Sequence, residues 1–421
     1  MLTKITVRDW KSFLEADLSI DPLTVLIGTN SSGKSNILDA LQFLGRIASG
    51  TNITAALQGD NTTSQLRGGI EWAPRKPGNE FEIYVEYFES PTTDYVYSIR
   101  CEVLASRCEV KSEQLDRIKY RVKKDGSRGR DSGRISLFRT DAVDNTSPTI
   151  IARLYNGKRG SPRQMNRSIS VLFQLYGQRV LSEIQEGVRA LVESLRDIFI
   201  LDPIPSHMRG FSPLAERLEP DAGNIAGVLA ALEGKRKTFV EQKLSDYAKK
   251  LPERDISRVY AETVGKFQTD AMLYCEEEYS STQTHTVDAR GMSDGTLRFL
   301  AILVALLTRP SGSLLVIEEV DNGLHPSRSE LLLDMLSKEG QEREVDIIVT
   351  THNPALLNAM GTKLVPFISA VHRDQNSGAS VITLLEDIQD LPKLLATGPV
   401  GNITSRGLLE RILKSRSEKN E

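Results

Sequence analysis

Cysteine is scarce in this chain: Cys101, Cys108 and Cys275 are the only three among 421 residues. They show no CxxC spacing, which excludes a disulfide framework and a cysteine-based structural metal site. The five histidines also lack the spacing of metal ligands. We therefore expect ordinary thiols in a reducing compartment and no structural metal ion.

Long apolar runs and an excess of one charge are also lacking. The longest apolar run, 299–307, is too short to cross a bilayer, and the N-terminus has no basic-then-apolar signal organisation. The net charge of -3 argues against a protein that is basic throughout and coats nucleic acid. These absences predict a cytoplasmic globular protein that does not enter a membrane.

Two local segments, 116–134 and 156–167, are nevertheless rich in lysine and arginine. They could bind the phosphate backbone of nucleic acid. Interspersed acidic residues favour the alternative, a solvated hairpin followed by a loop. Contact with nucleic acid therefore stays an open alternative.

Strand and helix patterns alternate at both ends of the chain. Residues 1–20 read as two short strands, 23–28 as a buried strand, and 35–48 as a helix with one apolar face. From residue 81 onward, successive segments read as the antiparallel strands of a meander. A mostly parallel sheet in an α/β fold is predicted by three further buried-strand segments that alternate with helices, 313–320, 345–352 and 364–371.

The middle of the chain has a different pattern. Apolar residues from Leu181 to Ile198 recur at steps of three and four, which is typical of a helix with a core-facing seam. A second helical stretch runs from about residue 224 to 251. Because the seam spans only about three heptads, a compact helical insertion is favoured over a partner-binding arm.

The most specific motif is GTNSSGKS, which follows a strand, opens a helix and fits G-x-x-x-x-G-K-[ST]. Small residues let the backbone N–H groups face phosphate oxygens, and the helix N-terminus adds positive potential. Lys34 would reach the β- and γ-phosphates, and Ser35 would supply a hydroxyl to Mg²⁺. The predicted nucleotide-binding residues of this loop are Gly28, Thr29, Asn30, Ser31, Ser32, Gly33, Lys34, Ser35 and Asn36.

Two adjacent carboxylates, Glu318 and Glu319, end the apolar strand of LLVIEEVDNGLHP. The C-terminal edge of strands is where α/β sheets present ligands. Because side chains alternate along a strand, Glu318 can face the metal while Glu319 positions or deprotonates an attacking water. The usual residue on the metal side is Asp, so Glu318 departs from the pattern.

A third strand, in VDIIVTTHNP, ends in Thr350, Thr351 and His352. A histidine there could hydrogen-bond a γ-phosphate or the attacking water. A lone histidine at a strand end is more often an ordinary hydrogen-bonding residue. The position of His352, one strand after the glutamate pair, favours the catalytic interpretation.

The stretch MSDGTLRFLAILVALL predicts a buried helix that begins at Ser293. Free N–H groups at its first turn, with Gly295 beside them, would permit close approach of a phosphate. Taken alone, the motif favours a plain N-cap, in which Ser293 or Asp294 satisfies those N–H groups.

The order of these motifs changes that weighting. Phosphate loop, Ser-x-Gly helix start, acidic strand, Asp-containing loop and Thr-Thr-His strand together resemble the ABC-type ATPase heads of RecF, SMC and OLD-like proteins. The likeness is strongest to prokaryotic "AAA family" ATPases, in which the acidic motif reads Ile-Glu-Glu and the signature reads Ser-Asp-Gly-Thr. It covers both ends of the chain and touches the middle at PDAGNIAGVLAAL.

The resemblance implies an ATP sandwich between two subunits, with ATP and Mg²⁺ as cofactors. Lys34, Glu319 and His352 of one subunit would be catalytic, and Ser35, Glu318 and Gln65, the weakly supported Q-loop candidate, would hold the metal. Ser293, Asp294 and Gly295 of the other subunit would close on the γ-phosphate. Asp321 falls where the family's D-loop communicates between subunits, and three residues of the first strands fall where related heads contact nucleotide, Arg8, Lys11 and Ser12.

The resemblance also implies an organisation and a function. We expect an α/β P-loop fold with a mixed sheet and an antiparallel β-subdomain. It would comprise an ABC-ATPase lobe at 1–145 with the phosphate loop and meander, a mostly helical insertion at 146–254, and a second lobe at 255–421 with the signature, the acidic strand, the D-loop and His352. OLD-like relatives carry a nuclease domain of TOPRIM type after the ATPase, whereas this chain ends where the ATPase should. The preferred interpretation is an ATP-hydrolysing switch that forms a homodimer or larger oligomer and controls a separate effector, a nuclease or toxin, in antiphage defence. The alternatives are a RecF-like DNA-binding ATPase in repair and an ATP-bound scaffold that sequesters an effector.

Overall fold

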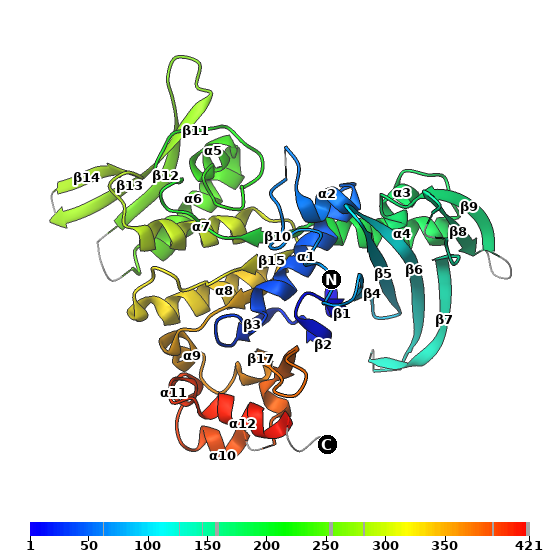
Figure 1. The fold of residues 1–421 in the computed structure, drawn as a ribbon. Helices are drawn as coiled ribbons and strands as arrows, with labels where there is room; N and C mark the ends of the chain where they lie inside the picture. The colour runs from blue at the N-terminus through cyan, green and yellow to red at the C-terminus, as the bar shows by residue number, and fades with distance from the viewer. Residues whose placement is uncertain are drawn as a thin grey trace.

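The computed structural model describes residues 1–61, 63–125, 127–144, 146–155, 160–251, 256–280, 283–389 and 391–417. Residues 156–159, in the second basic segment, lie outside this range. Figure 1 shows a central group of strands, an antiparallel meander on its right, a small sheet at its upper left and C-terminal helices below it.

Five parallel strands form the centre of the molecule, in the order β10, β15, β16, β3, β17. Leu314 and Val316 of β15 belong to one hydrophobic core, whereas Leu315 and Ile317 belong to the other. Successive side chains of a strand point to opposite faces, so both faces are covered and the strand reads as a continuous apolar run. The bounds are Leu23–Ile27 (β3), Ile198–Leu201 (β10), Leu314–Ile317 (β15), Asp346–Thr350 (β16) and Ile368–Arg373 (β17).

Helices cover both faces of these strands. Helix α1 (Lys34–Ala48) belongs to the core that it shares with the meander. Helices α7 (Asp294–Thr308) and α8 (Ser329–Arg343) belong to the other core. Helix α7 is apolar around most of its circumference, as expected for a helix buried on all sides. The predicted α/β fold with a mixed sheet is therefore confirmed.

The meander extends the central sheet through β17. Strand β18 (Ser380–Leu384) runs antiparallel to β17 and meets β2 through a parallel pairing of Ser380 with Phe13. Within the described residues this makes one sheet of 14 strands. The antiparallel part comprises β1 (Leu2–Trp10), β2 (Phe13–Ser19), β4 (Glu80–Ser90), β5 (Thr93–Leu104), β6 (Arg107–Val122), β7 (Arg128–Thr140), β8 (Thr149–Tyr155) and β9 (Gly160–Asn166).

The segment 146–254, expected to be a mostly helical insertion, contains strands as well as helices in its described part. Strands β8 and β9 extend the meander across the boundary placed at residue 145. The helices that follow are divided between the two cores, with α3 and α4 in one and α5 and α6 in the other. Their bounds are Val171–Tyr176 (α3), Ser182–Arg196 (α4), Ile225–Ala231 (α5) and Gly234–Ala248 (α6). The division into three ranges stays a prediction.

The predicted helical seam is also shorter than expected. Ile184, Val188 and Leu191 are buried on α4, but Leu181 is the exposed N-cap residue and Ile198 lies in β10. Pairing of β10 with β15 ends the helix, which is a tertiary contact that periodicity does not reveal. The stretch 224–251 likewise divides into two helices, since the chain is extended at Leu232 and Glu233.

A second, small sheet lies beside α5 and α6. It comprises β11 (Ser212–Pro213), β12 (Ile256–Val264), β13 (Asp270–Ser280) and β14 (Gln283–Asp288). Short helices complete the chain: α2 (Ile53–Gln58), α9 (Pro354–Ala359), α10 (Leu391–Leu395), α11 (Val400–Ser405) and α12 (Leu408–Ser417). In the part of the chain that the structure describes, no helix has the length and apolar character needed to span a bilayer.

Candidate nucleotide-binding site

The loop between β3 and α1 has the conformation that a phosphate cradle needs. Gly28 and Gly33 have positive φ values of 150° and 119°. A Cβ on Gly33 would lie 2.6 Å from the Ser380 hydroxyl, so a larger residue would have to displace β18. Helix α1 begins after Gly33 with no side-chain cap, so its first N–H groups remain available to a bound anion.

Neighbouring strands hold this loop in place. Ser380 Oγ donates to the backbone oxygen of Ser32 (2.5 Å), and Arg373 Nε donates to that of Ser31 (3.2 Å). Asn36 Nδ2 donates to Ser12 Oγ (2.7 Å), which ties α1 to the turn between β1 and β2. Within the described residues the buried Ser32 hydroxyl has no hydrogen-bond partner. The loop is therefore preorganised and keeps an unsatisfied polar group inside it.

Lys34 is folded back onto its own loop. Its ammonium group donates to the backbone oxygens of Gly28 (2.6 Å) and Thr29 (3.1 Å). Burial lowers the pKa of Lys34 below its ordinary value, while the charges of Glu319 and Glu318 act in the opposite direction. These two carbonyls hold the ammonium group where it can exchange them for phosphate oxygens.

Glu318 contacts two groups at once. Its Oε1 accepts a hydrogen bond from Ser35 Oγ (2.5 Å), and its Oε2 forms an ion pair with Arg67 Nη2 (2.5 Å). The hydroxyl and the carboxylate that the sequence assigned to Mg²⁺ thus lie side by side, although 283 residues separate them in the chain. The greater length of Glu318 relative to Asp still allows this contact.

Glu319 occupies a strained position at the end of β15. Its φ of 48° lies in the left-handed region, which a non-glycine residue rarely adopts. Its backbone N–H donates to Thr350 Oγ1 (2.8 Å), so the neighbouring strand β16 holds the turn. Successive side chains of a regular strand point to opposite faces. The turn at Glu319 nevertheless lets both glutamates line the same cavity at the carboxyl edge of the parallel strands.

Lys34, Ser35 and the two glutamates line one cavity of about 400 Å³. Cavities of this size hold small ligands. Its chemistry combines backbone donors, two cations and two carboxylates. The lining residues are Asn30, Ser31, Ser32, Gly33, Lys34, Ser35, Asn36, Glu318, Glu319, Thr350 and Arg373.

A second cavity of about 390 Å³ adjoins the first through Asn36 and Arg373, which line both. It is basic, and it contains Trp72, whose side chain is 57% exposed. A flat aromatic face among cations suits an anionic ligand with an aromatic ring. The other lining residues are Lys11, Ser12, Arg67, Arg75, Lys76 and Gly378.

Gln65, the Q-loop candidate, does not reach the Ser35–Glu318 pair in this structure. Its amide lies against Gly69, near the Gln58 side chain. Arg67, two residues further along the same loop, makes the contact with Glu318 instead. No sequence signal distinguished these two residues, because the loop between α2 and β4 has no regular periodicity.

The three residues carried over from the first strands have different positions. Ser12 contacts α1 as described, but Arg8 pairs with Glu15 and Glu82 at the surface. Lys11 forms a buried ion pair with Asp39 and donates to the backbone oxygen of Arg67 (2.7 Å). Lys11 therefore supports the loop that carries Arg67.

Asp321 and His352 lie outside the set of residues that line the first cavity. Asp321 is almost fully buried and accepts a hydrogen bond from Thr351 Oγ1 (2.6 Å). This bond joins the loop after Glu319 to the end of β16. His352 is exposed, and within the described residues no hydrogen bond or ion pair joins it to either glutamate.

Ser293, Asp294 and Gly295 are also absent from the residues that line the first cavity. Ser293 is the N-cap of α7 and accepts a hydrogen bond from Thr296 N (3.1 Å). Asp294 pairs with Arg209 (2.5 Å). A Cβ on Gly295 would lie 2.8 Å from the backbone oxygen of Gly323, so this glycine is required for close packing. Within one chain the plain N-cap is therefore what forms.

The first cavity fits a nucleotide triphosphate with Mg²⁺. The uncapped start of α1 and the free Ser32 hydroxyl suit phosphate oxygens. Ser35 and Glu318 are oxygen ligands of the kind that Mg²⁺ prefers. Among the described residues, no cluster of three or more His, Cys, Asp or Glu side chains could hold a metal alone. Mg²⁺ bound here would need further oxygens from the nucleotide and water.

Comparisons with known proteins show which family this chain matches. A family model described as "AAA domain, putative AbiEii toxin, Type IV TA system" matches residues 23–358. Curated proteins yielded no match. Solved structures with a similar fold include an SMC head bound to the C-winged helix domain of ScpA (16% identity, 91% of this chain, 96% of that chain, TM-score 0.46).

Two further structures are similar at the same level. One is the SMC head domain from Thermotoga maritima (16% identity, 91% of this chain, 98% of that chain, TM-score 0.41). The other is an SMC head with an extended coiled coil, bound to the C-terminal domain of ScpA from Pyrococcus furiosus (14% identity, 98% of this chain, 99% of that chain, TM-score 0.45).

The family match covers most of the chain. Residues 23–358 include the phosphate loop, both glutamates and the helix start at Ser293. Families of this kind bind ATP, and the predicted resemblance to ABC-type ATPase heads is confirmed by the match. The chain belongs to this AAA-domain family.

Proposed function

We propose that the protein is an ATP-hydrolysing switch that dimerises around ATP and controls a separate effector protein. The observation that carries this proposal is the cavity in which Lys34, Ser35, Glu318 and Glu319 meet. A phosphate loop alone would bind nucleotide, but the glutamate pair beside it adds the groups that hydrolysis needs.

The two adjoining cavities suggest how ATP lies. The triphosphate would occupy the cavity over α1, where Lys34 exchanges the carbonyls of Gly28 and Thr29 for phosphate oxygens. The adenine ring would lie towards Trp72 in the basic cavity. Arg373 and Asn36, which line both cavities, would stand beside the junction between ribose and phosphates.

The carboxylates would divide the chemistry. Mg²⁺, when bound, would neutralise charge on the β- and γ-phosphates. Ser35 and Glu318 would hold it, directly or through water, after Arg67 leaves the Glu318 carboxylate. Glu319 would accept a proton from the attacking water, and the bond from Glu319 N to Thr350 would fix the turn that presents it.

The site of one chain would be completed by a second copy. Ser293 and Gly295 do not line the cavity of their own chain, yet they lie at the start of a rigid, buried helix. In the dimer the start of this helix would approach the γ-phosphate of the ATP bound by the opposite subunit. His352 would approach the γ-phosphate of the ATP bound by its own subunit. Larger oligomers would build on the same contact.

The switch would control a separate effector protein, a nuclease or toxin, in antiphage defence. The family description names a putative toxin of a type IV toxin–antitoxin system, which supports a function coupled to a second protein. Genes next to this one offer an inexpensive test. A nuclease or toxin gene there would support the proposal, and a repair operon would contradict the defence setting.

DNA repair is the second candidate, and one observation favours it. Exposed cations gather near the tip of the β6–β7 hairpin, and within the described residues no ion pair joins Arg121, Lys123, Lys124 or Arg130 to an acid. Tight binding of duplex DNA with a steep salt dependence, in the absence of any companion protein, would support this alternative.

Glu319→Gln tests the proposed function and the scaffold alternative together. We expect ATP affinity to be retained and turnover to fall by about 100-fold or more, because the amide accepts no proton. Steady-state phosphate release and equilibrium ATP binding measure the two effects. Glu330→Gln, at an exposed position of α8, is the matched control and should have normal turnover. Unchanged turnover in Glu319→Gln would show that the base is another group, and negligible turnover in the native protein would favour the scaffold.

A further inference from the structure

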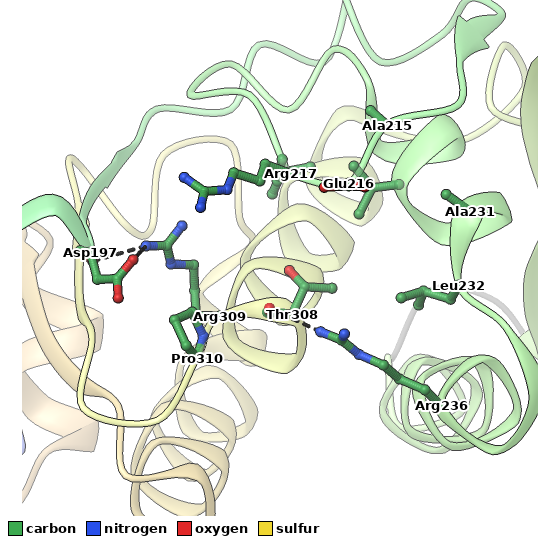
Figure 2. Close-up of a pocket in the computed structure, with 12 residues that line it drawn as sticks. Asp197, Ala215, Glu216, Arg217, Ala231, Leu232, Arg236, Thr308, Arg309 and Pro310 are labelled. Carbon is green, nitrogen blue, oxygen red and sulfur yellow. Dashed lines mark hydrogen bonds and ion pairs between the residues drawn. The ribbon is translucent and has the colours of Figure 1, made fainter. Parts of the chain in front are cut away.

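A third cavity, of about 320 Å³, lies at the C-terminal end of α7, at the opposite end of that helix from Ser293. Figure 2 shows it between the end of α7, the residue before β10 and the segment that leads into α5. Three arginines face it, Arg217, Arg236 and Arg309, together with two acids, Asp197 and Glu216.

Arg309 is held rigidly at one wall. Its Nη2 donates to the backbone oxygen of Asp197 (2.9 Å), and its guanidinium lies 3.6 Å from the Asp197 carboxylate and 5.0 Å from the centre of the Phe199 ring. In the described part of the chain its buried Nε has no hydrogen-bond partner. Arg309 is thus fixed in orientation but not fully satisfied, which is costly for a buried guanidinium.

Arg217 lies near Arg309 and is free. No described residue forms a hydrogen bond or ion pair with its guanidinium, although its backbone oxygen accepts from Asn224. Burial lowers the pKa of Arg309, Asp197 opposes that effect, and the charge of Arg217 lowers the pKa further. Two guanidinium groups therefore repel each other at one wall, and among the described residues Asp197 is the one acid that forms an ion pair with either of them.

Capping of α7 does not explain this arrangement. The last carbonyls of the helix accept from other arginines, since Arg236 Nη2 donates to Thr308 O (3.3 Å) and Arg343 Nε donates to Leu306 O (3.0 Å). Neither bond involves Arg217. The apolar part of the wall consists of Ala215, Leu218, Val228, Ala231 and Leu232.

We propose that this cavity binds a small phosphorylated molecule with an apolar or aromatic body. Planar guanidinium groups recognise phosphate oxygens by paired hydrogen bonds, and a dianion relieves the repulsion between Arg217 and Arg309. The apolar wall takes the rest of the ligand. The volume suits a molecule of about the size of an aryl or sugar phosphate.

Calorimetric titration of the full chain with phenyl phosphate tests this site. Arg217→Ala is the informative variant, because the side chain is exposed and forms no hydrogen bond or ion pair within the described residues. We expect it to weaken binding about tenfold, the loss of a charge-assisted bond. Arg217→Lys should retain part of the affinity. Arg189→Ala, an exposed arginine on α4, should bind like the native protein.

Lys34→Ala separates this cavity from the ATP site. Native affinity in Lys34→Ala together with weak binding in Arg217→Ala supports the proposal, whatever the outcome for ATP hydrolysis. Loss in Lys34→Ala with native affinity in Arg217→Ala would place the probe at the phosphate loop and overturn it. Absence of saturable binding up to about 10 mM, or equal binding of phenol, would overturn it as well.

Discussion

Helices α1 and α7 begin in opposite ways, although both start at motifs rich in small residues, GTNSSGKS and SDGT. The first turn of α1 has no side-chain cap and follows a glycine with φ of 119°. The first turn of α7 is closed by Ser293, which accepts from Thr296 N. The start of α1 is therefore ready for a phosphate within one chain, whereas the start of α7 is satisfied by its own residue.

This difference bears directly on the proposed dimer, in which the two helix starts would have different tasks. The open helix would bind phosphate within one chain, because its free N–H groups and the positive end of the helix suit an anion. The capped helix is stable without a ligand, so in the proposed dimer it would reach the γ-phosphate of the other copy from a conformation that is already formed. Variants at the two helix starts should therefore separate nucleotide binding from assembly.

Lys34→Ala should have the largest effect, because it removes the ammonium group beside the open helix. We expect ATP affinity to fall about 100-fold, the scale seen when a preorganised donor to a charged group is lost. Equilibrium binding of ATP measures it. Lys363→Ala, an exposed lysine after α9, is the control. Native affinity in Lys34→Ala would remove the phosphate loop from the proposal.

Ser293→Arg should affect assembly and not binding. A long cation at the start of α7 should leave the ATP affinity of a single chain unchanged, abolish dimerisation and lower turnover by about tenfold or more. Sedimentation with and without ATP, beside phosphate release, measures these effects. Full activity would refute the role of this helix. Ser293→Ala separates the cap from the assembly role, since loss of the cap alone costs about 1 kcal/mol of stability.

Gly295→Ala tests the packing of the capped helix. The new Cβ would lie 2.8 Å from Gly323 O and 2.9 Å from Arg328 Nη1. We expect the free energy of unfolding to fall by about 1–3 kcal/mol, because a buried methyl group must displace backbone. Chemical denaturation measures it. Gly177→Ala, where no atom lies within 4 Å of the added Cβ, should be nearly neutral. Equal stability of both variants would contradict the close-packing role.

Arg67→Ala should have the smallest effect. Arg67 is 53% exposed, so its ion pair with Glu318 contributes less than about 1 kcal/mol to stability. Removing it frees the Glu318 carboxylate, so half-maximal turnover should need about two- to fivefold less Mg²⁺. A Mg²⁺ titration of turnover measures this, with Arg153→Ala, a surface arginine paired with Asp141, as control. A higher Mg²⁺ requirement would show that Arg67 assists the metal.

Local chemistry made part of this protein predictable. The phosphate loop, the strand that ends in two glutamates and the helix that starts after Ser293 are each specified by residues close in the chain. Each of these features depends only on residues a few positions apart. Examples are the positive φ of Gly33, the alternation of side chains along β15 and the N-cap at Ser293. Such patterns follow from backbone geometry, so sequence reasoning reached them and their order.

Long-range contacts decided the rest. Pairing of β10 with β15 ended the predicted seam at Arg196, and the two cores divided the helices of 146–254. Arg67 rather than Gln65 pairs with Glu318, and Arg217 lines the same cavity as Arg309, although nothing in the sequence sets these arginines apart from the others. The sequence by itself determined which short segments could bind phosphate or cap a helix. Only the tertiary structure decided which distant charges face each other, because that depends on how strands and helices pack across hundreds of residues.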